Sequence, residues 1–193
     1  TSTLLDANGN VLLAGGFGVA ADGGLAIRGT GEVFCPGGLP CADKGKTGVV
    51  FTDTMVESRA FHTAELLKMG PNLEREGVLL IGGEGPDGVR ATAESFFLKD
   101  PAGFDKKAVA EMPTMAAGGR TRHTATYVSA QGFVHVVGGY SDKAHLTPVS
   151  QIDSFEIHQR QFQGATNFFS LEGRGGHSAV QLDHNAVLVF GGF

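Results

Sequence analysis

The sequence contains no tryptophan, two tyrosines and two cysteines, and no apolar run that approaches the length of a membrane span. A transmembrane helix needs about 20 predominantly apolar residues, so we expect no membrane span. Two cysteines are too few ligands for a structural zinc site. Lysine and arginine form no cluster, and the formal net charge is −5. The positive surface that nucleic-acid binding needs is therefore absent, which excludes nucleic acid as a partner class.

Glycine and apolar residues are abundant instead. The chain has 193 residues with 30 glycines and 41% hydrophobic residues, which is enough apolar material for a core. Valine, phenylalanine and leucine gather in short runs without a long helical period. This pattern is typical of short strands joined by tight turns. The sequence predicts an all-β fold.

The two cysteines, Cys35 and Cys41, bracket a short segment rich in proline and glycine. Such a segment turns easily and can bring two Cα atoms to bridging distance. We expect a local disulfide between them, with two free thiols as the alternative. A disulfide would indicate an oxidising compartment.

An arginine placed three residues before a histidine, followed by an apolar run and a glycine pair, occurs three times. A shortened fourth copy opens the chain and ends at Gly15–Gly16. The glycine pairs recur at intervals of 67, 56 and 53 residues, which indicates repeated four-stranded units. The complete copies comprise Arg59, His62, Gly82 and Gly83; Arg120, His123, Gly138 and Gly139; and Arg174, His177, Gly191 and Gly192.

A second landmark recurs between these copies, an acidic residue two positions before a phenylalanine. It occurs as Glu32-Val33-Phe34, Glu94-Ser95-Phe96 and Asp153-Ser154-Phe155. In the second repeat we expect strands over 62–68, 77–81, 93–99 and 104–110, with a loop over 84–92 and a turn over 100–103. The landmarks divide the chain into units 1–58, 59–119, 120–173 and 174–193, the last of them incomplete.

These landmarks together resemble kelch repeats, especially those of large bacterial secreted proteins and lipoproteins. The resemblance covers almost the whole chain, and it implies that each repeat is a four-stranded antiparallel blade of a β-propeller. The tryptophan usual on the fourth strand is missing, and Phe104 and Phe162 stand in its place. About 3.5 blades are present, whereas propellers close with four to eight. We therefore expect the ring to be completed by the remaining blades of a longer polypeptide or by a second copy.

The repeated histidines suggest two roles. His62, His123 and His177 could converge near the propeller axis and bind a metal, because imidazole is a common metal ligand. A residue that recurs in every repeat is better explained by a role that every repeat shares. We therefore expect the arginines and histidines to bond to turn carbonyls or to Glu32, Glu94 and Asp153, joining neighbouring blades, and we expect no metal and no cofactor.

The loops that vary most between repeats are expected on one rim of the propeller. They span 17–31, 84–92 and 140–149, and binding residues often lie on such loops when a rigid scaffold carries them. Candidate ligand contacts on this rim are Asp87, Arg90, Tyr140, Asp142 and His145.

The sequence contains no catalytic constellation, such as a Gly-x-Ser-x-Gly elbow. The first hypothesis is a non-catalytic module outside the cytoplasm, in the periplasm, at the cell surface or secreted, that binds a protein or glycan through the rim loops. An alternative is a carbohydrate-active enzyme, similar to the mutarotases or oxidases among kelch propellers, with its site at the mouth of the central channel. A third hypothesis is a structural spacer in a large surface protein.

Overall fold

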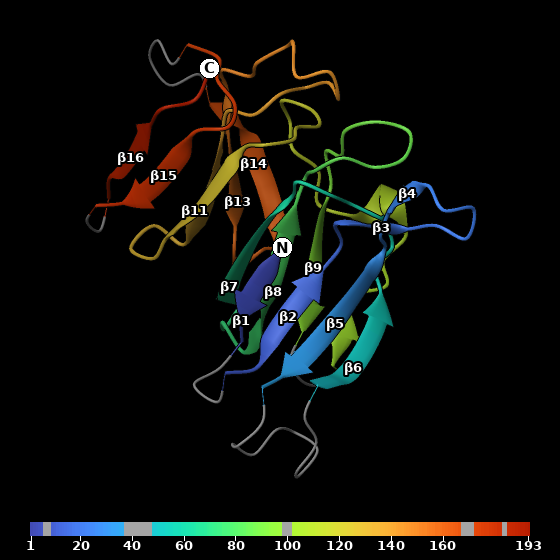
Figure 1. The fold of residues 1–193 in the computed structure, drawn as a ribbon. Helices are drawn as coiled ribbons and strands as arrows, with labels where there is room; N and C mark the ends of the chain where they lie inside the picture. The colour runs from blue at the N-terminus through green and yellow to red at the C-terminus, as the bar shows by residue number, and fades with distance from the viewer. Residues whose placement is uncertain (6–8, 37–47, 98–101, 167–171, 183–184) are drawn as a thin grey trace.

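The computed structural model describes residues 1–5, 9–36, 48–97, 102–166, 172–182 and 185–193. These residues form an all-β fold of antiparallel sheets (Figure 1). Within them, no helix is long and apolar enough to cross a membrane. The one helical element of this part of the chain is a short 3-10 turn, η1 (Val109–Glu111).

Three four-stranded sheets follow one another along the chain, and each is a meander in which consecutive strands pair. Sheet 1 consists of β1 (Ser2–Leu4), β2 (Val11–Ala14), β5 (Thr30–Cys35) and β6 (Gly48–Thr54). Sheet 2 consists of β7 (Thr63–Met69), β8 (Arg75–Ile81), β9 (Ala93–Phe97) and β10 (Gly103–Phe104). Sheet 3 consists of β11 (Thr124–Val128), β12 (Phe133–Val137), β13 (Ile152–Glu156) and β14 (Gln161–Thr166).

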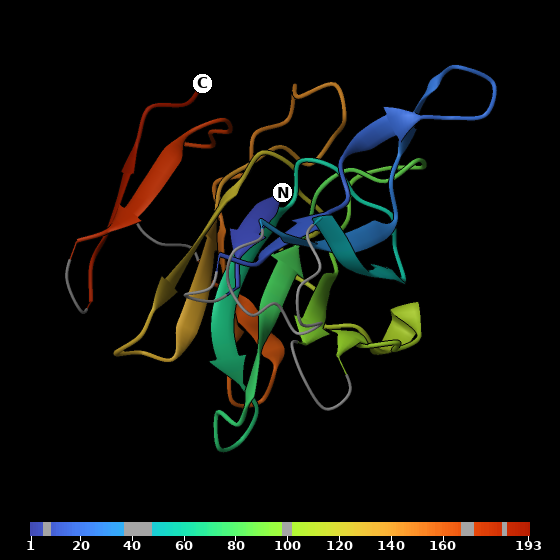
Figure 2. The ribbon, with the colours of Figure 1, turned by 60° about the horizontal axis from the view of Figure 1, so that its bottom comes forward.

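Two smaller pairs complete the fold. Sheet 4 consists of β15 (Ser178–Gln181) and β16 (Val187–Phe190), and a hairpin of β3 (Phe17–Val19) and β4 (Leu25–Ile27) extends between β2 and β5. The first strands of successive sheets lie side by side in the order β1, β7, β11 and β15 (Figures 1 and 2). Each sheet therefore meets the next along its first strand.

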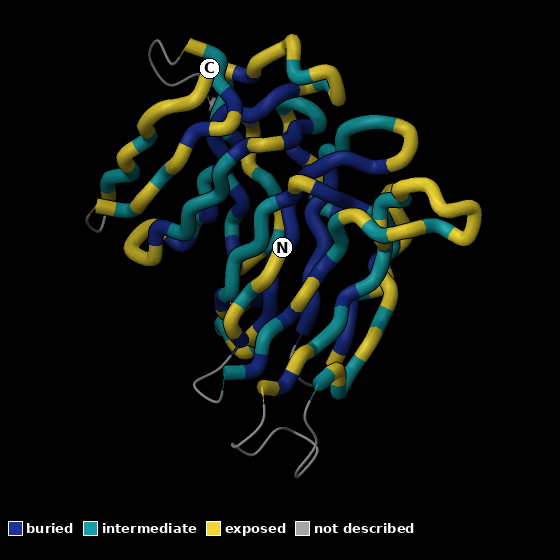
Figure 3. Tube along the Cα trace, in the orientation of Figure 1, coloured by how far each residue is buried: buried dark blue, intermediate teal, exposed yellow. Residues whose placement is uncertain are grey.

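The apolar core lies between the sheets in two layers. One layer joins sheets 1 and 2 and contains Leu12, Leu80 and Phe96, and the other joins sheets 2 and 3 and contains Ile81, Phe97 and Phe155. Because alternate residues of a strand point to opposite faces, sheet 2 contributes to both layers. This explains the continuous apolar run 78–81 of β8, which is buried on both faces (Figure 3).

Aromatic pairs on the third and fourth strands repeat the same geometry in two sheets. Phe96 and Phe104 in sheet 2 pack edge to face with centroids 5.1 Å apart, and Phe155 and Phe162 in sheet 3 do so at 5.3 Å. In both sheets the phenylalanine of the fourth strand thus packs on the phenylalanine of the acidic landmark.

The predicted fourth strand over 104–110 is wrong. β10 ends at Phe104, and η1 occupies Val109–Glu111. Two consecutive side chains are held by different repeats, since Asp105 pairs at 2.6 Å with Arg160, which directly precedes β14 of sheet 3, and Lys106 pairs at 2.9 Å with Asp53 of sheet 1. These contacts accompany the departure of the chain from the sheet edge. The expected turn over 100–103 lies largely outside the described residues.

Candidate functional site

The repeated histidines contact the preceding repeat. Nε2 of His123 lies 3.0 Å from Oγ1 of Thr63, which begins β7. The same contact joins His62 to Thr1 at 2.9 Å and His177 to Thr124 at 2.8 Å. The three imidazoles therefore link each first strand to the next one.

The repeated arginines hold the end of the second strand within their own repeat. Arg59 is fully buried, and its Nη1 donates to the carbonyl oxygens of Gly82 and Thr92 at 2.9 and 3.1 Å. Its Nη2 lies 3.5 Å from Glu94. Arg120, also fully buried, donates in the same way to Gly138 and Gln151 and pairs with Asp153.

Two of the acidic landmark residues, Glu94 and Asp153, also hold the segments that lead into Arg59 and Arg120. Glu94 accepts a hydrogen bond from the backbone N–H of Val56 at 2.7 Å, and Asp153 accepts one from Ala116 at 2.7 Å. A buried carboxylate is stabilised when it is both paired and hydrogen-bonded. These residues thus connect the buried arginine to the linker between two repeats.

The glycine pair of the second repeat, Gly82 and Gly83, leaves no room for a side chain. A Cβ atom at Gly82 would lie 2.7 Å from the Arg120 carbonyl oxygen and 2.7 Å from Cε1 of His123, and one at Gly83 would lie 2.9 Å from Cβ of His62. Both glycines have positive φ, 62° and 95°, which L-residues with a Cβ rarely adopt. The first glycine therefore packs on the next histidine and the second on the histidine of its own repeat.

Burial controls the charge of the histidines. It lowers the pKa of His62 to about 2 and that of His123 to about 3, and in each the neighbouring arginine charge adds to the effect. The pKa of His177 is lowered as well, mainly by burial. All three rings are therefore neutral near pH 7. Among the described residues, no three histidine, cysteine, aspartate or glutamate side chains gather as metal ligands would.

A second group of contacts lies on the exposed side of the histidine contacts between repeats. We call it the rim cluster, and it consists of Phe17, Phe61, Glu84, Arg122 and His145. The rings of Phe17 and Phe61 pack edge to face with centroids 5.5 Å apart, and the Arg122 guanidinium lies 4.2 Å from the Phe61 centroid. Nε2 of His145 lies 2.9 Å from Glu84 and 3.2 Å from Nε of Arg122. One ring nitrogen cannot serve both, so His145 either donates to Glu84 or accepts from Arg122, depending on its tautomer.

Phe61 and Arg122 occupy the same position in successive repeats, directly before the histidine. Both have a φ of 53°, and Gly176 stands there in the last repeat with a φ of 65°. A bulky residue in this region of backbone space is an outlier that costs about 1–3 kcal/mol, and such outliers occur in turns and cluster at functional sites. Both side chains are exposed. Two exposed side chains with this unusual backbone conformation therefore lie in contact with each other.

The predicted ligand residues are part of a bonded network around this cluster. Arg90 pairs with Asp87 at 2.8 Å and with Glu57 at 3.2 Å, while Asp142 accepts the backbone N–H of Thr147 at 2.7 Å. Lys143 donates to the Gly85 carbonyl oxygen at 3.1 Å and so joins the loops over 84–92 and 140–149.

Tyr140 and His145 stand apart from the other candidates. Tyr140 is buried, its hydroxyl donates to the Phe193 carbonyl oxygen at 2.6 Å, and its ring lies 5.4 Å from that of His145. Of the five predicted residues, His145 alone belongs to the rim cluster. Sequence reasoning missed Phe17, Phe61, Glu84 and Arg122. The sequence did carry a signal for Phe61 and Arg122. The residue directly before each repeated histidine varies, although the arginine and histidine around it recur.

Comparison with known proteins gives a similarity of fold. No family model matches the sequence, and no curated protein matches it. Among solved structures, the one described as "Structure of YjhT" has a TM-score of 0.63 and 13% sequence identity, over 92% of this chain and 54% of that chain. The chain thus spans about half the length of YjhT. At this identity the similarity concerns the fold alone, an all-β arrangement of four-stranded antiparallel sheets.

Proposed function

We propose that the chain is a segment of a kelch-type β-propeller that binds a protein or glycan ligand through the rim cluster, without catalysis. The four-stranded meanders, the adjacent first strands and the similarity to YjhT support the propeller. The repeated arginines, histidines and glycines support the scaffold because their contacts are the same from one repeat to the next.

The observation that carries the binding role is the exposed contact between Phe61 and Arg122. Aromatic residues and arginine are enriched where proteins bind partners, and an exposed ring in a fixed orientation loses little conformational entropy on binding. Phe17 and Phe61 are 49% and 42% exposed. The ion pairs and hydrogen bonds of the surrounding loops support the same role, since they hold the surface in one shape before a ligand arrives.

A labelled form of the chain applied to an oligosaccharide array and to a displayed random-peptide library tests the proposal. We expect at least one ligand class to be retained, and we expect Phe61→Ala to abolish its retention. Val109→Ala is the matched control, because Val109 is also an exposed apolar residue, at 49%, but lies on η1. Retention that survives Phe61→Ala would place the ligand elsewhere and contradict the proposal.

One observation favours the alternative of a carbohydrate-active enzyme. Glu65 lies on β7, a first strand with β1 and β11 on its two sides, and burial raises its pKa to about 7. A carboxyl group with such a pKa is suited to general acid–base catalysis near neutral pH. Glycoside hydrolysis ordinarily uses two carboxyl groups, so a single one fits a proton transfer on a sugar. Product formation from an array hit, lost in Glu65→Gln, would replace binding with this function.

We also propose that further sheets cover the outward faces of sheets 1 and 4, the first and last sheets of the series. These further sheets belong to a longer polypeptide or to a second copy. The outward faces of sheets 1 and 4 carry exposed apolar side chains, which are Leu4, Leu13, Phe34 and Val49 on sheet 1 and Val180, Leu188 and Phe190 on sheet 4. Such faces ordinarily pack against a partner. The proposed location outside the cytoplasm rests on the disulfide that the sequence predicts between Cys35 and Cys41. Cys35 ends β5, whereas Cys41 lies outside the described residues.

A further inference from the structure

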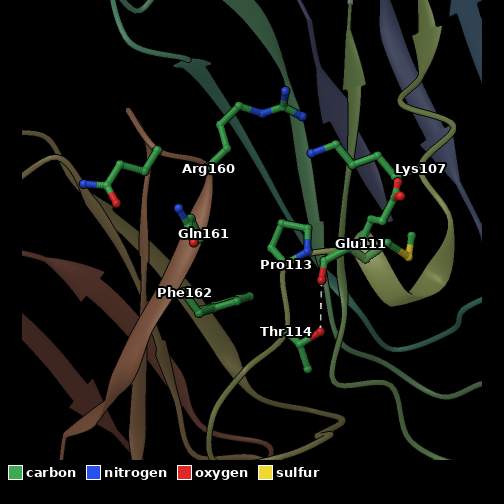
Figure 4. Close-up of a pocket in the computed structure, with 9 residues that line it drawn as sticks. Lys107, Glu111, Pro113, Thr114, Arg160, Gln161 and Phe162 are labelled. Atoms are coloured by element: carbon green, nitrogen blue, oxygen red, sulfur yellow. Dashed lines mark hydrogen bonds between the residues drawn. The ribbon is translucent and has the colours of Figure 1, made fainter.

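A pocket opens between the outer edges of sheets 2 and 3, away from the rim cluster. Its volume is about 360 Å³, which is in the range of small-molecule sites. Residues of the segment 107–114 form one wall, and residues 159–162 at the start of β14 form the other (Figure 4). We call it the edge pocket.

The edge pocket exists because the second repeat departs from the pattern of the third. In sheet 3, β14 remains paired with β13 from Gln161 to Thr166. In sheet 2, the chain leaves the edge after Asp105, whose N–H still bonds to Ser95, and returns at Pro113, whose carbonyl accepts from Ala93. This departure from the sheet edge between Asp105 and Pro113 distinguishes the second repeat from the third. A scaffold that all repeats share does not need such a feature.

One wall of the edge pocket is held in position by contacts outside it. Arg160 has a φ of 57°, pairs with Asp105 at 2.6 Å and lies 4.9 Å from the Phe97 ring centroid. Phe162 is packed against Phe155. Figure 4 shows Phe162 extending toward Pro113 and Thr114 on the opposite wall. The wall is therefore formed before any ligand binds, which reduces the entropy lost on binding.

Several polar groups of the edge pocket have no protein partner. Within the described part of the chain, no hydrogen bond or ion pair engages the Lys107 ammonium, the Glu111 carboxylate or the side-chain amide of Gln161. Lys107 donates, the carboxylate of Glu111 accepts, and the amide of Gln161 does both. The pocket thus offers donors and acceptors together.

The charges of the edge pocket balance. Lys107 and Glu111 have opposite charges, and the charge of Arg160 is compensated by Asp105. A strongly anionic ligand would meet the charge of Glu111, and a cationic one would meet the charge of Lys107. Hydroxyl groups satisfy both donors and acceptors without a net charge, and the Phe162 ring adds an apolar surface for C–H groups.

We infer that the edge pocket is a second binding site, distinct from the rim cluster, which takes a neutral polyhydroxylated ligand of the size of one sugar unit. The inference does not depend on the ligand of the rim cluster. Each polar group that lacks a protein partner then bonds to a ligand hydroxyl, and the sugar ring packs on Phe162.

The test is a titration of the isotope-labelled chain followed by nuclear magnetic resonance. The probes are D-glucose, D-galactose, D-mannose and N-acetyl-D-glucosamine, with D-glucuronate and D-glucosamine as charged comparators. We expect saturable shifts of backbone amides in 107–114 and 159–162 with at least one neutral sugar. No saturation with any neutral sugar, or tighter binding of a charged comparator, would overturn the inference.

Two variants localise the site. Gln161→Ala removes one bonding group and is expected to weaken the affinity about tenfold, as loss of one hydrogen bond does. Gln163→Ala is the matched control, because Gln163 lies two residues along the same strand and outside the edge pocket, and it is expected to bind like the wild type. Equal affinities of wild type and Gln161→Ala would also overturn the inference, provided that the spectrum of the variant shows a folded chain.

Discussion

Oγ1 of Thr63 lies 3.0 Å from Nε2 of His123, so the first residue of β7 bonds to the residue that precedes β11. Removing the hydroxyl leaves a buried ring nitrogen without a partner, which costs about 1–3 kcal/mol. We predict that Thr63→Val lowers the free energy of unfolding by this amount, measured by denaturant titration. Thr126→Val on β11 is the control, since no hydrogen bond is found for the Thr126 hydroxyl within the described residues, and similar losses in both variants would contradict the prediction.

The contact of Gly82 with His123 gives a second prediction. A Cβ at Gly82 meets both the Arg120 carbonyl and the imidazole, and φ is 62°, so Gly82→Ala adds strain to a clash. We expect a loss of at least about 2 kcal/mol. Gly88 has open space around its Cα and no positive φ, so Gly88→Ala is expected to change the stability little. Equal losses of stability in Gly82→Ala and Gly88→Ala would mean that the contacts between sheets 2 and 3 adjust easily to a Cβ atom at Gly82.

The features that sequence reasoning reached are those that every repeat needs. An arginine, a histidine and a glycine pair recur because each sheet meets its neighbour through the same contacts, as Arg59 and Arg120 illustrate. Their spacing was sufficient to predict four-stranded units and an all-β chain. The loop candidates Asp87 and Arg90 do lie together, yet they pair with each other.

The features that sequence reasoning missed depend on contacts between distant residues. The end of β10 at Phe104 is accompanied by ion pairs of Asp105 with Arg160 and of Lys106 with Asp53. No local sequence pattern predicts these ion pairs. Phe17 and Phe61 are 44 positions apart in the sequence and meet because the hairpin of β3 and β4 extends over the joint. Such contacts follow from the assembled sheets, so periodicity within one repeat does not predict them.

Glu65 makes the stability fall as the pH rises. Burial raises its pKa from 4.5 to about 7, so its contribution is fully present below about pH 4.5 and is lost as the pH rises through about 7. The expected loss is about 3 kcal/mol at most. We predict that the stability difference between wild type and Glu65→Gln, measured by denaturant titration, changes by this order across the interval. A flat difference for Glu65→Gln would mean that water reaches the carboxyl group.

The buried histidines act in the opposite direction. The pKa values of His62 and His123 are lowered from 6.5 to about 2 and about 3, so their contribution is present above about pH 6.5 and is lost as the pH falls toward these values. We predict that Glu65→Gln, which lacks the opposing contribution, loses stability steadily from about pH 6.5 to about pH 4. Denaturant titrations across this interval measure the slope, and a stability that stays constant would show that the rings are already protonated or are solvated in the folded chain.

The outward face of sheet 4 determines how the isolated chain associates. Leu188 and Phe190 on β16 are 44% and 52% exposed beside Val180, and their burial against another apolar sheet releases about 25 cal/mol for each Å² of apolar surface. We predict that the 193-residue chain has a light-scattering mass above 20.1 kDa at high concentration. Leu188→Lys places a charge in the contact and is expected to return the mass to that of a monomer, whereas Val109→Lys on η1 leaves the association intact. A monomer at every concentration would contradict the proposal that a second copy covers this face, because an uncovered partner face on sheet 1 is present in the same solution.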